Sequence, residues 1–217
     1  MIELDAATVL LQWAAGGLFF CWLTTRRREV GLGYGWMLRG TYGLMGVLAL
    51  VIGLRTDAVV LREVGSIGLV AGATVALVVS IVRRRAGVLG QRQVVERRSA
   101  RVAAMTGIDR EEQRFDADAA EFPPALDLVA PLFGLVGIVA GAVAADGPTG
   151  LSIARVVVGA AFLGAISDAM LLGHWYLVQP GLARSPLLEL VRWTGALWLP
   201  ELVVLLWPTG MWSVLNG

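Results

Sequence analysis

The sequence predicts an all-α fold, a bundle of about six transmembrane helices formed by a single chain of 217 residues. Two observations support this prediction. Hydrophobic residues make up 57% of the chain and charged residues 16%, whereas soluble domains contain about 45–50% and about 25% of these classes. The apolar residues also gather in blocks of about 18–22, the length that a helix needs to cross a hydrocarbon core of roughly 30 Å.

Six apolar segments are long enough to be spans. They cover about residues 7–23, 36–54, 64–82, 126–145, 151–178 and 187–207. Runs of arginine end the first segment, at Arg26 to Arg28, and the third, at Arg83 to Arg85. The fifth segment is the longest, so we expect it to tilt or to lie partly in the membrane interface.

The segment from 83 to 124 is the only long polar part of the sequence. We therefore predict one transmembrane domain over 1–217, with a cytoplasmic loop at about 83–124 that ends at Pro123-Pro124. Several apolar residues of this loop are spaced to form an amphipathic surface helix, namely Val88, Val94, Val95, Val102 and Met105. We expect the loop to fix the topology, and docking of a partner is the alternative.

Arginine placement predicts the orientation of the bundle. With the N-terminus outside, the inner side contains Arg26 to Arg28, the arginines between Arg83 and Arg114, and Arg184. The outer side then contains only Arg55, Arg62 and Arg155. This asymmetry satisfies the positive-inside rule, so we predict that both termini lie outside. All 18 basic residues are arginine, which indicates a GC-rich genome, and we expect the plasma (inner) membrane of a bacterium.

Several classes of function lack their sequence signals. One cysteine, Cys21, and one histidine, His174, exclude a disulfide framework, a thiolate cluster and a multi-histidine metal site within one chain. The net charge of +1 gives no field that attracts nucleic acid. The motifs of serine hydrolases, zinc peptidases, P-loop proteins and dinucleotide-binding folds are all missing. We therefore predict no catalytic residue and no metal site.

Two glycine pairs have the GxxxG spacing. Gly68 and Gly72 lie in the third segment, and Gly137 and Gly141 lie in the fourth. Such pairs leave a flat helix face that another backbone can approach closely, so we expect helix packing at both faces. A similarity between residues 42–49 and 133–140 also allows a duplicated helix pair.

Two carboxylates, Asp168 and Glu201, lie deepest inside the predicted spans. An ionisable group inside a bilayer is a functional hypothesis by default. Asp168 belongs to the inner half of its span, and Glu201 follows Pro200 in the outer half of the last span. Roughly 10 Å along the membrane normal separates them, so they are candidates for an ion or proton relay through water and not for a shared metal site.

A polar cluster surrounds Asp168 and includes Ser167, His174, Trp175 and Tyr176. Asp168 and His174 are six positions apart and point roughly 120° away from each other on a helix, so they do not form a dyad. We expect His174 to bond a neighbouring carbonyl at the inner interface. The alternative is a haem ligand or a quinone contact; no other cofactor is predicted.

Three functional hypotheses follow. The glycine faces, the tryptophans near span ends and the lack of a catalytic motif favour a non-catalytic accessory or assembly subunit of a larger membrane complex. Its partners are the lipid bilayer and other membrane subunits or further copies of this chain. The second hypothesis is a small transporter or channel that uses Asp168 and Glu201. The third is a membrane redox component with haem or quinone near His174.

Overall fold

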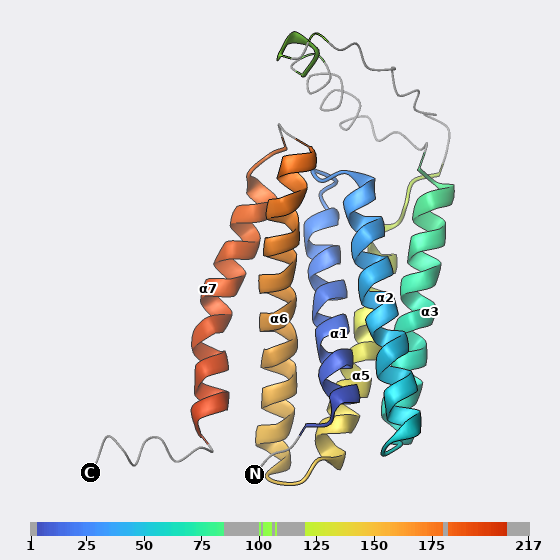
Figure 1. Ribbon diagram of the computed structural model, residues 1–217, viewed down its shortest axis with the longest axis vertical. Coiled ribbons are helices and arrows are strands. Elements are labelled where there is room, and N and C mark those ends of the chain that lie inside the picture. Colours follow the sequence, from blue (N-terminus) through green and yellow to red (C-terminus); the bar gives the residue numbers. More distant parts are fainter. Residues whose placement is uncertain are drawn as a thin grey trace, which may run out of the picture.

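The computed structural model describes residues 4–84, 100, 102–105, 107, 120–179 and 182–207. Within these residues, six long helices lie side by side in an elongated bundle (Figure 1). They are α1 (Ala6–Thr25), α2 (Leu32–Arg55), α3 (Val60–Val82), α5 (Val129–Ala144), α6 (Thr149–Val178) and α7 (Ser185–Leu206). A short 3-10 helix, η1 (Pro124–Leu128), leads into α5. The predicted all-α bundle is confirmed.

Five helical stretches of the described part are long and apolar enough to cross a membrane: α1, α2, α3, η1 with α5, and α6. This is the pattern of an integral membrane protein. α7 has 22 residues, which is also a sufficient length, but it contains Glu189, Arg192 and Glu201. Its apolar character is therefore weaker, and its crossing of the membrane stays a prediction.

The start of the third segment was predicted four residues too late, because α3 begins at Val60. The prediction placed Arg62 and Glu63 in a loop, since a hydropathy pattern treats charges as solvated. In the structure the Arg62 side chain is 0% exposed. It forms ion pairs with Asp5, before α1, and with Glu63 of α3 itself. Because it is paired in this way, the guanidinium of Arg62 can lie inside the bundle, and α3 includes Arg62 and Glu63.

α1 is the central helix, and it packs against α2, α5 and α6 (Figure 1). α3 packs on α2 and α5, whereas α7 lies at the edge of the bundle against α6. The largest apolar core residues include Leu11 and Phe20 of α1, Leu38 of α2 and Leu69 of α3, each of which is fully buried. α1 is apolar because most of its surface faces neighbouring helices; the exposed side chains of Val9 and Trp13 mark the side that does not.

The glycines of α3 lie against α5. A Cβ atom added to Gly65 would lie 2.6 Å from Cα of Gly137, and one added to Gly72 would lie 3.0 Å from the backbone nitrogen of Ala130. One added to Gly68 would enter the ring of Phe133. The two glycine-rich faces therefore pack against each other within this chain, at backbone contact.

The glycines of α5 also receive side chains from α1. A Cβ atom on Gly137 would lie 2.7 Å from Cδ2 of Leu11, and one on Gly141 would lie 2.5 Å from Oγ1 of Thr8. α5 is thus held between α1 and α3, and glycine at these positions lets both neighbours approach.

The beginning of α1 and the end of α7 lie at one end of the bundle, and the end of α3 and the start of η1 lie at the other (Figure 1). At this second end Arg83 donates a hydrogen bond of 2.7 Å to the carbonyl of Glu121. Of the predicted amphipathic surface helix, Val88, Val94 and Val95 lie outside the described residues. Val102 is helical, and Met105 is helical with its side chain exposed.

Candidate functional site

The carboxyl group of Asp168 is fully buried, with 0% exposure, on the face of α6 that packs against α1, where side chains of α2 reach it. Tyr42 of α2 donates its phenolic hydrogen to Oδ1 of Asp168 across 2.6 Å. The second oxygen, Oδ2, is buried and has no hydrogen-bond partner in the described part of the chain. In the interior of the bundle, this carboxyl thus has one oxygen with a hydrogen-bond partner and one oxygen, called the open oxygen below, without a partner.

Ser167 extends this contact into a chain of polar groups. Its Oγ lies 2.9 Å from the phenolic oxygen of Tyr42 and accepts a hydrogen bond of 3.2 Å from the indole of Trp13. It also lies 2.5 Å from the carbonyl of Leu163, one turn back on α6. The hydroxyl groups of Ser167 and Tyr42 are each both donor and acceptor. Together they connect Asp168 to α1 and α2.

A second tyrosine holds the backbone at the same place. Tyr34 donates to the carbonyl oxygen of Asp168 across 3.1 Å, and its side chain is fully buried. Tyr34 and Tyr42 are eight residues apart on α2, so both rings lie on the face that is turned toward α6. On its other side Tyr34 contacts the ring of Trp175, with centroids 6.0 Å apart.

Small residues of α1 make room for this cluster. A Cβ atom added to Gly17 would fall into the ring of Tyr42. The neighbouring Gly16 is in backbone contact with Gly164 and Ala160 of α6. Because α1 has no side chains at positions 16 and 17, α6 reaches its backbone and the phenol of Tyr42 passes beside it to Asp168.

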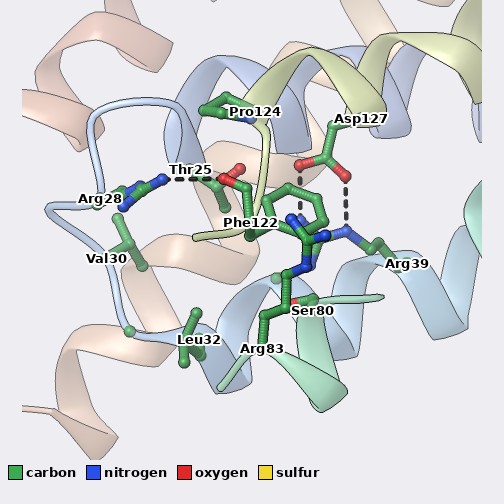
Figure 2. A pocket seen from close by; sticks show the side chains of 12 residues that line it. Thr25, Arg28, Val30, Leu32, Arg39, Ser80, Arg83, Phe122, Pro124 and Asp127 are labelled. Carbon is green, nitrogen blue, oxygen red and sulfur yellow. Dashed lines mark hydrogen bonds and ion pairs between the residues drawn. The ribbon is translucent and has the colours of Figure 1, made fainter. Parts of the chain in front are cut away.

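A second buried aspartate provides a comparison within the same bundle. Asp127 of η1 receives two hydrogen bonds from Arg39 of α2, of 2.7 Å to Oδ1 and 2.6 Å to Oδ2 (Figure 2). Both side chains are 4% exposed. This bidentate pair neutralises both charges and satisfies both carboxylate oxygens. In the described residues Asp168 has no such cation.

The structure does not bring Glu201 to Asp168. Glu201 of α7 has its Oε1 3.8 Å from the place of a Cβ atom on Gly159, and the amide of Gln12 lies against the same glycine. Its Oε2 is buried without a hydrogen-bond partner in the part of the chain that is described. Gly159 and Asp168 are nine residues apart on α6, which is about 14 Å along the axis. Glu201 and Gln12 therefore form a separate polar group.

Of the remaining residues of the predicted cluster, only Trp175 touches the site, through the ring of Tyr34. His174 is exposed, and its Nδ1 lies 2.8 Å from the carbonyl of Met170 on the same helix. Trp175 donates to the amide oxygen of Gln179 across 3.1 Å, and Tyr176 donates to the carbonyl of Ala183. Over the described residues there is also no group of three or more histidine, cysteine or carboxylate side chains that would hold a metal ion.

Sequence reasoning identified Asp168 and Ser167 but missed Trp13, Tyr34 and Tyr42. One signal was available, because two of the three tyrosines of the chain lie within one predicted span or at its edge. A buried phenol needs a hydrogen-bond partner. The register between α1, α2 and α6, which selects that partner, is not readable from one sequence.

The cluster of Trp13, Tyr34, Tyr42, Ser167 and Asp168 is therefore a hydrogen-bonded group built around one carboxyl. Chemically, its open oxygen can take and release a proton, and the adjoining hydroxyl groups can pass one on. Comparisons with protein-family models, with curated proteins and with solved structures found no match to this chain.

Proposed function

We propose that this chain is a small membrane transporter or channel that moves protons, with Asp168 as the proton-exchanging group. The observation that carries the proposal is the unequal environment of its two oxygens. Oδ1 accepts a hydrogen bond from Tyr42, whereas Oδ2 is buried and has no hydrogen-bond partner in the described structure. Such a carboxyl inside a bilayer is costly, which makes a functional role the default interpretation.

The comparison with Asp127 supports this interpretation. At Asp127, a buried carboxylate that joins η1 to α2, Arg39 supplies a cation and satisfies both oxygens. The buried Glu63 leaves its Oε2 without a partner in the described residues but is paired with Arg62, so the lack of a cationic partner is what distinguishes Asp168 from both. A carboxyl that served only packing at position 168 would leave an uncompensated polar atom, which is expensive in a protein interior. A carboxyl that alternates between its protonated and its ionised form needs one oxygen that is not held by a protein donor, so that this oxygen can bind the proton.

The neighbouring hydroxyl groups support a proton in preference to a metal cation. Tyr42 and Ser167 both donate and accept hydrogen bonds, so a proton can pass along them. Hard cations such as Ca²⁺ require about six to eight oxygen ligands, whereas one carboxyl and two hydroxyl groups meet at this place. Glu201 and Gln12 supply a second polar group farther along α6, and ordered water would have to connect the two.

The predicted role as an accessory or assembly subunit stays a prediction. Its first motivation was the pair of glycine faces, and these faces pack against each other inside the chain. Co-purification in mild detergent tests it. The redox hypothesis also stays a prediction, tested by the absorption spectrum of the purified protein. We further propose a bacterial inner membrane, with both termini outside, from the arginine placement.

Proton flux into liposomes tests the function. The purified full-length chain is reconstituted with an internal pH-sensitive dye, and valinomycin sets a potassium diffusion potential of defined sign. We expect proton flux in the wild type. In Asp168→Asn, which keeps an acceptor for Tyr42 but has no exchangeable carboxyl, flux falls to the rate of protein-free vesicles. The matched control is Asp146→Asn, at an exposed carboxyl between α5 and α6.

Full proton flux in Asp168→Asn would overturn the proposal. A second experiment uses the same liposomes but replaces the sodium and potassium ions of the external buffer with a large organic cation. Ionophores that do not carry protons keep the membrane potential at the same value in both buffers. A flux that disappears with sodium or potassium would assign a metal cation to the site in place of a proton. A proton flux that is unchanged by the replacement supports the proposal.

A further inference from the structure

A small pocket opens at the end of the bundle where the chain leaves α3 for the arginine-rich loop (Figure 2). Its cavity volume is about 50 Å³, and its polar lining includes Thr25, Arg28, Arg39, Ser80 and Arg83. These side chains come from the end of α1, the connection that follows it, α2 and the end of α3. The backbone that returns to η1, with Phe122 and Pro124, closes one side.

Two of these arginines, Arg39 and Arg83, do not use all their donors on the described residues. Arg39 holds Asp127 through Nε and Nη2, while its Nη1 points to Gly35, where an added Cβ atom would lie 2.8 Å away. Arg83 donates from Nη1 to the carbonyl of Glu121. For neither residue is another hydrogen bond found within the described chain. Arg39 Nη1 and the remaining nitrogens of Arg83 are thus available to a ligand.

Counted over the described residues, the charged side chains at the pocket leave one positive charge. Its three arginines face two carboxylates, Asp127 and Glu121, the latter of which pairs with Arg28 at 2.8 Å. Ser80 accepts a hydrogen bond of 3.0 Å from Trp36, which leaves its own hydroxyl hydrogen to donate. An anion with one net charge and several acceptor oxygens matches this arrangement of donors.

The pocket lies at the ends of two apolar helices, where the phosphates of a surrounding bilayer are expected. It is lined by Leu32, at the start of α2, and by Arg83, directly after the last residue of α3. Both positions mark the boundary between an apolar span and its polar flank. Guanidinium groups at such a boundary attract anionic headgroups, and their planar donor geometry fits a phosphate group.

We propose that this pocket binds the phosphate group of a singly charged phosphate ester, supplied by the headgroup of an anionic membrane lipid. Arg39 and Arg83 donate to the phosphate oxygens from two sides, and Ser80 donates from α3. Arg39 also forms the ion pair with Asp127 that joins α2 to η1. A headgroup bound to Arg39 therefore contacts this ion pair. This inference is independent of the function proposed for Asp168.

Native mass spectrometry of the full-length chain in mild detergent tests the pocket. Phosphatidylglycerol is titrated, and the apparent dissociation constant of the first bound lipid is measured. Arg83→Gln should weaken it about tenfold, because one charge-assisted hydrogen bond is lost. Arg84→Gln is the matched control, since Arg84 is the exposed neighbour that does not line the pocket. Gly35→Ala should weaken binding with every charge kept, because its methyl group fills the space beside Arg39.

The outcomes separate the two sources of a phosphate ester. Glycerophosphoglycerol, the singly charged phosphodiester that remains when the acyl chains of phosphatidylglycerol are removed, is titrated in parallel. Binding of the lipid alone, with dependence on Arg83, supports the lipid headgroup. Arg83-dependent binding of glycerophosphoglycerol alone keeps the phosphate pocket but overturns its lipid source. Equal losses in Arg83→Gln and Arg84→Gln, or no binding in either titration, overturn the pocket itself.

Discussion

Tyr42 donates its phenolic hydrogen to Oδ1 of Asp168 across 2.6 Å, and this is the only side-chain hydrogen bond that the Asp168 carboxyl receives from the described residues. The contact joins α2 to α6 in the interior of the bundle. It leaves Oδ2 open, whereas the carboxylate of Asp127 is satisfied on both oxygens. The difference between these two buried aspartates leads to opposite expectations for their variants.

Replacing Tyr42 by Phe should impair proton flux and stability together. The change leaves both oxygens of Asp168 without a donor and removes a hydroxyl group from the proposed relay. The loss in the free energy of unfolding should be about 1–3 kcal/mol, the cost of an unsatisfied buried acceptor. Tyr34→Phe is the control, because Tyr34 bonds the backbone of Asp168 and not its carboxyl. Flux that responds equally to both substitutions would argue against a special role for the Tyr42 contact.

The ion pair of Arg39 and Asp127 should behave as a structural element. Removing one partner, in Arg39→Leu or Asp127→Leu, leaves an unpaired buried charge and should lower the free energy of unfolding by about 3–5 kcal/mol. The double variant should recover most of this loss, since apolar side chains replace both charges. A double-mutant cycle of unfolding in detergent measures the coupling. A loss in the double variant that equals the sum of the two single losses would show that the two side chains are not coupled.

The contact between α1 and α6 should not tolerate a methyl group. In Gly164→Ala the new Cβ atom would collide with the backbone of Gly16, so the helices must separate. Overpacking of this kind costs about 1–3 kcal/mol, visible as a lower midpoint of thermal unfolding. Gly173→Ala on the same helix has no atom within 4 Å of the added carbon and should unfold as the wild type does. Equal midpoints for both variants would contradict the close approach of α1 and α6.

Cysteine labelling should report the orientation of the bundle. Cys21 is 0% exposed, so it should give no background with a membrane-impermeant maleimide. Asp57→Cys, in the exposed connection between α2 and α3, should react on intact cells. Arg84→Cys should react only after the membrane is opened. The reverse pattern would show that the arginine-rich end faces outward.

Much of the fold could be predicted because apolar blocks and arginine runs report directly on the bilayer. The number of long helices and most of their ends follow from them. The start of α3 did not follow, because Arg62 is buried by its pairing with Asp5, a contact between residues that are far apart in sequence. The glycine pairs indicated close packing, but a GxxxG pattern does not record whether the partner helix belongs to the same chain.

The candidate site could be predicted only in part. Asp168 was identifiable from the cost of a carboxyl within an apolar span. Its partners were not, because Tyr42 and Trp13 reach it only through the way in which α1 and α2 are rotated against α6. That rotation depends on Gly16 and Gly17, whose contacts appear only in three dimensions. His174 was grouped with Asp168 by its nearness in sequence, yet it points to solvent or lipid at another level of α6.

The central claim is that the Asp168 carboxyl takes and releases a proton, and infrared difference spectroscopy tests it most directly. Spectra of the membrane-reconstituted protein at acidic and alkaline pH are subtracted, and the carbonyl stretching band of protonated carboxyl groups is examined. We predict that one component of this band changes between the two pH values in the wild type and in Asp146→Asn, and that this component is missing in Asp168→Asn, whereas the other carboxyl groups contribute equally in all three proteins. Identical difference spectra for the wild type and Asp168→Asn would contradict the claim.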